Sequence, residues 1–372
     1  MMLGLLLARA GVAVEVHEKH ADFLRDFRGD TIHPSTLEVI AELGLLEELL
    51  KLPHQKVRTL GGQFGDHPVT IANFSRLPTR CGFIAMMPQW DFLNFLARQA
   101  ARYPQFRLRM GSEIKSLDGI EADLVVGADG RHSTVRALAS LEVADFGAPM
   151  DVLWFRLSRR GSDPETSMGR FDAGRIFVLI NRGDYWQCAC VIPKGATGAV
   201  HRAGLPAFRA DIARMMPFAA DRAGEIADWD QVKLLTVKVD RLKRWYREGV
   251  LCIGDAAHAM SPVGGVGINL AIQDAVAAAN ILVKPLLAGN LATEHLAAVQ
   301  RRREWPVKMT QRLQLAVQDR VIARALRANQ PLTPPLFFRL VARFPWLQRL
   351  PGRLIGMGMR PEHVQTDATG RD

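Results

Sequence analysis

The chain has 372 residues, of which 48% are hydrophobic and 23% charged, and its 48 Lys and Arg outnumber its 38 Asp and Glu to give a net charge of +10. These proportions are typical of a soluble globular protein and exclude a disordered, collagen-like or fibrous chain. The length predicts two domains or one large composite domain.

The first fifty residues predict a helix, a buried strand and a second helix. Residues 1–10 (MMLGLLLARA) form the end of a helix that stops at Gly11, and residues 12–16 (VAVEV) form a buried strand. Apolar residues at helical spacing predict an amphipathic helix over residues 36–50, with Ser35 as its N-cap. We expect no signal peptide at the apolar start, because no basic residue precedes it and a strand pattern follows directly.

The middle of the chain alternates between helical and extended patterns. A helix is predicted over residues 90–102, and a short buried strand over residues 124–126. The block that follows is rich in strands and is interrupted by one helix near residues 205–216. Its predicted strands cover residues 152–157, 176–180, 185–192 and 232–239.

The last third returns to an α/β pattern and then becomes helical. A buried strand over residues 250–253 precedes a glycine-rich turn and an alanine-rich helix over residues 269–287. Residues 301–372 are helical with proline breaks and carry nine more basic than acidic residues. A β block inserted into an α/β fold predicts that the substrate lies between the two layers.

Three places after buried strands carry polar residues suited to binding a dinucleotide. The first is Glu18, because an acid just beyond such a strand can accept hydrogen bonds from both ribose hydroxyls. The second is Asp129, which lies between Gly127 and Gly130 with Arg131 and Arg136 nearby. A charged strand end and a plain strand–turn–helix junction remain the alternative interpretations of these two.

The third place carries the strongest pattern. The strand at residues 250–253 leads into Gly254 and Asp255, at the strand edge where open α/β sheets bind ligands. The loop SPVGGVGIN at residues 261–269 then leads into a helix. Its backbone N–H groups and the positive end of the helix favour an electron-rich ring that gains negative charge on reduction.

These residues resemble a known family. The sequence IGDAAH at residues 253–258, followed by Pro262, Gly264, Gly267 and Asn269, is similar to the second flavin motif of the single-component FAD-dependent aromatic hydroxylases, the para-hydroxybenzoate hydroxylase-like flavoprotein monooxygenases. Residues 124–136 look like their Asp-Gly motif. The match runs in order from residue 1 to about residue 287.

The resemblance implies a fold and a division of the chain. It implies an α/β fold with a Rossmann-like FAD-binding domain at residues 1–145 and 240–300. A mostly antiparallel β-sheet substrate domain is inserted at residues 146–239, and residues 301–372 form a basic helical region. The sequence begins inside the family's first helix, so we expect the first strand and its G-x-G-x-x-G loop to be missing.

The resemblance also implies the residues that bind FAD. Glu18 would bind the adenosine ribose, Arg28 would reach the pyrophosphate and nicotinamide region, and Gln89 would lie near the flavin. Asp129 would contact both cofactors, Asp255 would hold the ribityl chain, and Pro262 would lie beside the substrate. The full predicted set is Glu18, Arg28, Gln89, Asp129, Gly254, Asp255, Pro262, Gly264, Gly265, Gly267, Ile268 and Asn269.

The implied activity is the hydroxylation of a phenol-like or polycyclic aromatic molecule. NAD(P)H would reduce FAD, and O2 would then form a flavin C4a-hydroperoxide that transfers one oxygen atom. The flavin itself is expected to carry out the bond-breaking step, so no catalytic side chain is predicted. No metal is predicted either. Aromatic residues of the β block could line the substrate pocket or simply fill its core, namely Trp154, Phe155, Phe177, Tyr185 and Trp186.

Other interpretations stay open from the sequence. A flavin-dependent reductase or halogenase could use the same scaffold, although the W-x-W-x-I-P signature of halogenases is absent. An inactive remnant could instead bind a membrane or a partner through its basic tail. The apolar residues of the tail resemble an interfacial helix beside Arg339, Arg343 and Arg349, namely Leu336, Phe337, Phe338, Leu340, Val341, Phe344, Trp346 and Leu347. We favour the alternative, in which these residues pack against the FAD-binding domain.

The four cysteines indicate a reducing compartment. They are too few for a disulfide scaffold and fit no zinc pattern. We therefore expect a cytoplasmic oxidoreductase that binds no nucleic acid. Peripheral membrane contact and a homodimer are further expectations.

Overall fold

The computed structural model describes residues 1–24, 31–330 and 332–368. Helix α1 (Met2–Arg9) is almost wholly buried and ends before Gly11, whose φ of +89° lies in the left-handed region that favours glycine. The predicted helix and its stop are therefore confirmed. Strand β1 (Val14–Glu18) begins two residues later than predicted.

The predicted helix over residues 36–50 is wrong in two respects. The chain forms α2 (Pro34–Glu42) and a short α3 (Leu46–Leu49), separated by Gly44 with a φ of +74°. Ser35 is not the N-cap, because Pro34 already occupies the first helical turn and His33 precedes it. Proline is favoured there, since its missing N–H would have had no partner inside the helix.

Short parallel sheets form the α/β layer. Strand β1 pairs in parallel with β7 (Phe106–Met110), and β8 (Val125–Gly127) pairs in parallel with β17 (Val250–Cys252). A hairpin joins β17 to β16 (Tyr246–Arg247). These sheets share one apolar core with α1, α4 (Gln89–Ala100) and α8 (Gly267–Leu287). The helix predicted over residues 90–102 is thus confirmed.

A seven-stranded sheet forms the second layer, in the order β14-β10-β13-β12-β11-β4-β5. All its neighbouring strands are antiparallel except β11 and β4, which confirms the mostly antiparallel prediction. Its strands are β4 (Thr59–Phe64), β5 (His67–Asn73), β10 (Met150–Ser158), β11 (Met168–Asp172), β12 (Arg175–Asn181), β13 (Tyr185–Pro193) and β14 (Lys233–Leu235). The sheet therefore takes β4 and β5 from outside residues 146–239, the range predicted for the substrate domain.

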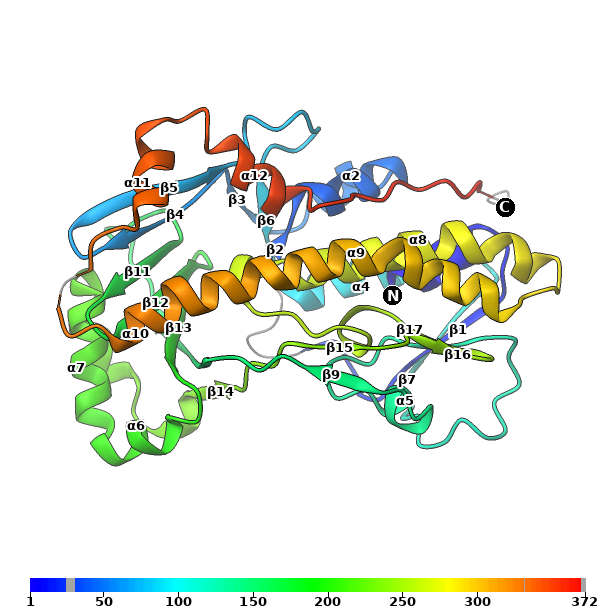
Figure 1. The fold of residues 1–372 in the computed structure, drawn as a ribbon, viewed down its shortest axis with the longest axis horizontal. Coiled ribbons are helices and arrows are strands. Elements are labelled where there is room, and N and C mark those ends of the chain that lie inside the picture. Colours follow the sequence, from blue (N-terminus) through cyan, green and yellow to red (C-terminus); the bar gives the residue numbers. More distant parts are fainter. Residues whose placement is uncertain (25–30, 331, 369–372) are drawn as a thin grey trace.

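Helices cover this sheet on both faces. One face packs against α7 (Leu205–Met215), beside the short α6 (Thr197–Ala203). The other face meets the π-helical turn η5 (Gln318–Ile322) and α10 (Ala323–Arg327). Both continue the long helix α9 (Thr293–Val317), which runs beside α8 across the molecule (Figure 1).

Two helices of the C-terminal region pack at the edge of the seven-stranded sheet. Helices α11 (Leu336–Arg343) and α12 (Arg349–Gly356) pack on β5. By length and apolar composition residues 263–287 could cross a membrane, but 72% of that apolar window is buried inside the fold, as in a core helix. The shorter elements are β2 (Thr31–Ile32), β3 (Gln55–Val57), β6 (Ile84–Met86), α5 (Thr134–Leu138), β9 (Val143–Asp145) and β15 (Asp240–Leu242).

Candidate functional site

The turn after β17 places a carboxylate at the start of α8. Gly254 has a φ of +58°, and a Cβ on it would lie 2.9 Å from the Cβ of Ala271, so no larger residue fits. The next residue, Asp255, is half-buried. One of its carboxylate oxygens lies 3.9 Å from where a Cβ on Gly267 would be. Asp255 therefore stands beside the first turn of a 21-residue helix.

The loop between that turn and α8 is shaped by two glycines with positive φ. Gly264 has a φ of +79° and Gly265 a φ of +63°. A Cβ on Gly265 would lie 2.7 Å from Oγ1 of Thr31, and this hydroxyl donates a hydrogen bond to the Gly265 carbonyl at 2.8 Å. No side chain of the described residues caps α8, so its first N–H groups can serve a ligand.

Asn269 ties the glycine loop to the strand and helix opposite. Its Oδ1 accepts hydrogen bonds from the backbone N–H of His33 at 2.9 Å and from Oγ1 of Thr36 at 2.8 Å. Its Nδ2 donates to the Thr31 carbonyl at 3.2 Å. The side chain of Asn269 thus acts inside the protein, and its backbone is what remains for a ligand. Its neighbour Ile268 is half-buried.

A buried charge cluster holds the Gly254 turn from behind. Asp274 of α8 is fully buried and accepts hydrogen bonds from the Gly254 N–H at 3.1 Å, Nε2 of His258 at 2.6 Å and Nε of Arg303 at 3.0 Å. Burial alone would raise the pKa of Asp274, but the charges and hydrogen bonds of His258 and Arg303 hold it below its ordinary value. Arg303 also binds Glu362 at 3.1 Å, which brings the C-terminal segment to this cluster.

Three buried glutamines of α9 and η5 hold the rest of the loop. Gln311 donates to the carbonyls of Asp240 and Ala259 at 2.8 and 3.2 Å. Gln314 donates to the carbonyls of Ser261 and Val263 at 2.9 and 2.8 Å, and its Oε1 accepts from the Ser261 N–H at 3.2 Å. Gln318 donates to Oγ of Ser261 at 2.7 Å. We call Gln311, Gln314 and Gln318 the glutamine ladder.

The other residues predicted from the sequence belong to several different elements. Glu18 ends β1, and its Oε1 accepts a hydrogen bond from the His20 N–H at 3.0 Å. Gln89 is the first residue of α4 and is half-buried. Arg28 lies outside the described residues. Pro262 is exposed at the start of the glycine loop.

Asp129 has a local structural role. Its carboxylate accepts hydrogen bonds from Oγ of Ser133 at 2.5 Å and from the Val135 N–H at 3.1 Å, at the start of α5. The nearby Arg136 connects the two motifs, since it donates to the Ala256 carbonyl at 3.4 Å and lies 3.5 Å from the Asp240 carboxylate. Asp129 itself remains exposed and can still meet a ligand.

One face of the seven-stranded sheet meets the glycine loop. Val263 packs in the same apolar cluster as Trp154, Phe171 and Leu235 of the sheet. Of the five aromatic residues considered from the sequence, only Trp154 belongs to this cluster. The others lie elsewhere: Phe155, Phe177 and Trp186 are core residues beneath α7, and Tyr185 stacks with Arg156, whose guanidinium is 5.0 Å from the ring centre.

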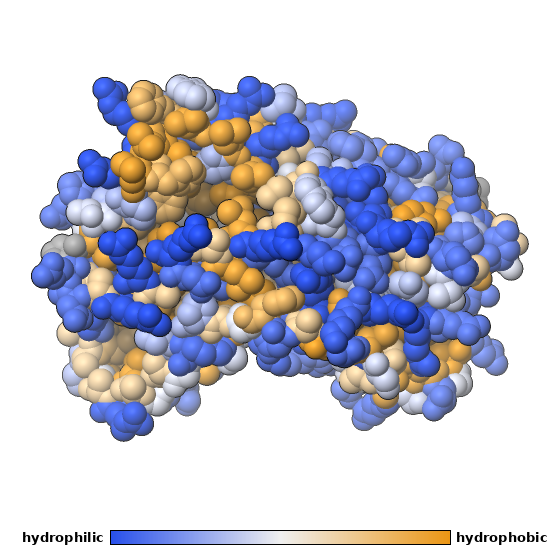
Figure 2. All heavy atoms as spheres, in the orientation of Figure 1, coloured by the Kyte–Doolittle hydropathy of each residue, from blue (hydrophilic) through white to orange (hydrophobic). Residues whose placement is uncertain are grey.

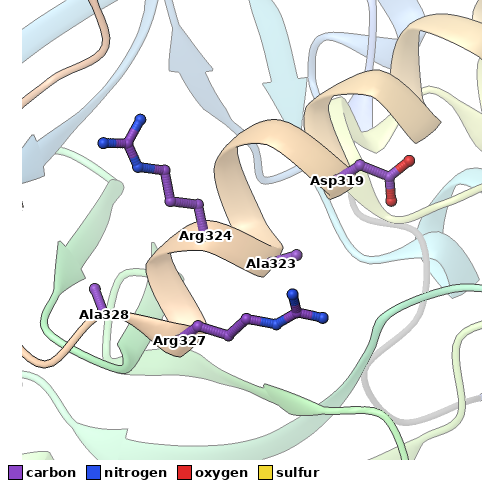
Figure 3. A pocket seen from close by; sticks show the side chains of 5 residues that line it. All are labelled: Asp319, Ala323, Arg324, Arg327 and Ala328. Atoms are coloured by element: carbon purple, nitrogen blue, oxygen red, sulfur yellow. The ribbon is translucent and has the colours of Figure 1, made fainter.

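Two surface hollows lie beside α10, and neither is lined by a predicted flavin-binding residue. They measure about 420 and 410 Å³. Figure 3 shows Arg324 and Arg327 leaving α10 in different directions at the first of them, with Asp319 one turn earlier. These hollows belong to the basic C-terminal helices.

The four cysteines carry free thiols and are all buried. Cys252 lies in β17, directly before the Gly254 turn, and burial raises its pKa to about 12. The thiol beside the site is therefore protonated and not a nucleophile.

Comparison with known proteins gives consistent findings. A family model described as an FAD binding domain matches residues 1–312. The chain is 31% identical over 396 residues to the 6-methylpretetramide 4-monooxygenase of Streptomyces rimosus, covering 99% of this chain and 92% of that protein. It is 27% identical to a rifampicin monooxygenase of Streptomyces venezuelae, covering 74% of this chain and 60% of that protein.

Solved structures show the same fold. The anhydrotetracycline hydroxylase OxyS from Streptomyces rimosus is similar with a TM-score of 0.71 at 23% identity, covering 95% of this chain and 73% of that one. A probable FAD-dependent monooxygenase from Pseudomonas aeruginosa, pqsL, gives a TM-score of 0.71 at 20% identity, covering 87% and 94%.

Proposed function

Because the chain belongs to the FAD-binding-domain family of flavoprotein aromatic monooxygenases, we propose that it hydroxylates a fused-ring phenolic molecule with FAD, NAD(P)H and O2. In this reaction NAD(P)H supplies two electrons, one oxygen atom enters the ring and the other leaves as water. We infer the substrate class from two similar proteins, which are named for their action on 6-methylpretetramide and on anhydrotetracycline.

The residues present fit FAD. Glu18 stands at the end of β1, where it would bind the ribose hydroxyls. Asp255 would accept hydrogen bonds from the ribityl chain, and the uncapped first turn of α8 would face the oxygen-bearing edge of the ring. Gly264 and Gly265 both have positive φ and carry no side chain. The loop would therefore offer its backbone to the oxygen-bearing edge of the ring.

Bound flavin supplies the redox chemistry, and the chain supplies orientation and electrostatics. The positive end of α8 would stabilise negative charge on the ring edge. Val263 of the loop packs in one apolar cluster with Trp154 and Leu235 of the sheet, and these side chains would form an apolar wall against water. Trp154 is accordingly the aromatic residue that we assign to the substrate side.

The observation that carries the proposal is the place of the glycine loop. It presents backbone N–H groups and the Asp255 carboxylate on one side and packs Val263 into the face of the β-sheet on the other. A ligand on the loop and a ligand on the sheet would therefore touch each other. This is the arrangement that a cofactor and its substrate need.

The proposal is tested by titrating the purified full chain with FAD and following flavin fluorescence. We expect saturable binding that Asp255→Ala weakens, while the exposed loop variant Asp123→Ala leaves it unchanged. With a fused-ring phenol, NAD(P)H and labelled O2, the label should appear in the product. Binding without substrate-dependent incorporation of oxygen would favour the reductase alternative, and equal affinities for both variants would refute the assignment of Asp255.

We place the reaction in the cytoplasm. The support is the four cysteine thiols, all buried and none in a disulfide, as a reducing compartment maintains them.

A further inference from the structure

Helices α11 and α12 expose an unusual number of large apolar side chains. We define the apolar patch as Leu336, Phe337, Leu340, Phe344, Trp346, Leu350 and Leu354. Leu336 is 69% exposed and Trp346 is 65% exposed, as much as many charged residues. Figure 2 shows apolar atoms gathered at the upper left of the molecule, where Figure 1 places α11. A contiguous patch of this kind marks an interaction surface.

Helix α12 is packed with its small residues inward and its large apolar residues outward. A Cβ on Gly352 would lie 2.7 Å from the Asn73 carbonyl oxygen of β5, and one on Gly356 would lie 3.0 Å from a methyl carbon of Leu77. Leu350 and Leu354 point away from this contact and are exposed. A helix stabilised only by burial in its own domain would show the opposite arrangement.

Helix α11 shows the same inversion. Val341 is its one fully buried side chain, and Phe338 also contacts the protein, with its ring centre 5.8 Å from that of Phe64 in β4. Leu336, Phe337 and Leu340 are left to the solvent. The apolar content of α11 therefore exceeds what its packing on the sheet uses.

The charged residues of α11, α12 and the segment between them all have one sign. Arg339, Arg343, Arg349 and Arg353 are exposed among the apolar residues, and residues 333–356 contain no Asp or Glu. A second copy of the chain would bring four more arginines to the same contact, because a symmetric dimer pairs identical surfaces. Self-association through this face would thus be opposed by repulsion between like charges.

We propose that α11 and α12 dock on the surface of an anionic lipid bilayer. Leucine, phenylalanine and tryptophan would enter the boundary between headgroups and acyl chains, and the four arginines would bind lipid phosphates. Short helices lying flat, with Trp346 between them, have the composition of interfacial helices. An acidic protein would satisfy the arginines but would need a matching apolar hollow. This surface interaction goes beyond the proposed hydroxylation and does not depend on it.

The test is co-sedimentation of the purified full chain with vesicles of phosphatidylcholine alone or mixed with phosphatidylglycerol. We expect binding to the mixed vesicles that weakens as salt is raised and is lost on pure phosphatidylcholine. Reversing Arg339 and Arg343 to Glu should lower the partition coefficient by about tenfold or more. The variant L336S/F337S/W346S should lose binding while retaining its circular dichroism spectrum.

A matched control removes exposed apolar residues elsewhere. Leu287 and Trp305 are 56% and 53% exposed on α8 and α9, and L287S/W305S should bind vesicles as the wild type does. Equal losses in the control and patch variants would overturn the proposal, as would failure of the wild type to bind phosphatidylglycerol vesicles. A wild-type dimer that L336S/F337S/W346S dissociates, with no vesicle binding, would show instead that the face pairs two copies.

Discussion

Replacing Asp274 with Asn should destabilise the protein far more than a single isosteric change on its surface would. The carboxylate is fully buried and serves three donors, on Gly254, His258 and Arg303. An amide has one acceptor oxygen, so at least one donor loses its partner, at a cost of about 1–3 kcal/mol. The Arg303 guanidinium, itself fully buried, also loses an opposite charge.

The structure sets the expected magnitude. Breaking a buried ion pair by removing one partner costs about 3–5 kcal/mol. Arg303 keeps Glu362 as a second partner at 3.1 Å, so we expect the lower end, about 3 kcal/mol. The free energy of unfolding is measured by urea denaturation followed by tryptophan fluorescence. FAD affinity should fall as well, because the Gly254 turn carries Asp255.

The control is an ion pair that is partly open to water. Glu304 and Lys308 lie one helical turn apart on α9 with an N–O distance of 2.9 Å. Glu304→Gln should change the free energy of unfolding by no more than about 0.5 kcal/mol. If the free energies of unfolding of Asp274→Asn and the wild type differ by less than about 1 kcal/mol, the buried cluster does not anchor the Gly254 turn.

Three further changes probe the same site. Gly265→Ala should weaken FAD binding about tenfold in a fluorescence titration, because its φ is +63° and its Cβ would clash with Thr31; unchanged affinity would contradict the loop assignment. Gln314→Leu removes hydrogen bonds to three backbone groups and should lower the free energy of unfolding by about 2 kcal/mol in urea. Burial lowers the pKa of His33 from 6.5 to about 4 in the folded protein. As the pH falls, the unfolded protein therefore binds a proton at His33 before the folded protein does. Stability should be complete above pH 6.5 and about 2 kcal/mol lower at pH 5. His33→Asn keeps a donor toward the Ile355 carbonyl and should make the free energy of unfolding depend less on pH. If the variant and the wild type lose the same stability between pH 6.5 and 5, His33 is not the responsible group.

Two helices could be predicted from local sequence signals, namely a terminating glycine and the spacing of apolar residues. Gly11 ends α1 with a positive φ, and the spacing of apolar residues predicted α4 correctly. The spacing of apolar residues also predicted one long helix over residues 36–50, but Gly44 breaks it into α2 and α3. A glycine with positive φ ends a helix even where the apolar periodicity continues.

The composition of the seven-stranded sheet could not be derived from local patterns. Strands β4 and β5 precede the predicted β block by more than seventy residues and join it at β11 in a parallel pair. Such a pairing depends on tertiary contacts, and neither strand propensity nor turn chemistry encodes the partner. For the same reason strand geometry alone, which puts the neighbours Trp154 and Phe155 on opposite faces of β10, does not determine which of them faces the glycine loop.

The residues of the candidate site also differ in whether local sequence patterns could identify them. Asp255 and the glycines lie within one continuous motif, so residue spacing was sufficient to find them. Arg303 and Gln318, the first and last of these partners, lie 48 and 63 residues beyond Asp255 and reach the motif only because α9 packs beside it. The spacing of Gln311, Gln314 and Gln318 is the one local signal that could have identified the ladder, since it puts three amides on one helical face.

Helix α9 therefore does more than cover the FAD-binding layer. Near its middle Arg303 fixes Asp274 and through it the Gly254 turn, and farther along Gln314 fixes the segment around Pro262. Beyond Gln318 the same helix becomes the π-helical turn and α10, which rest on the β-sheet with Val263. Because one continuous helix contacts the cofactor turn, the glycine loop and the substrate-side sheet, it sets their separation. The distance between flavin and substrate would thus be fixed by helix geometry rather than by the loop alone.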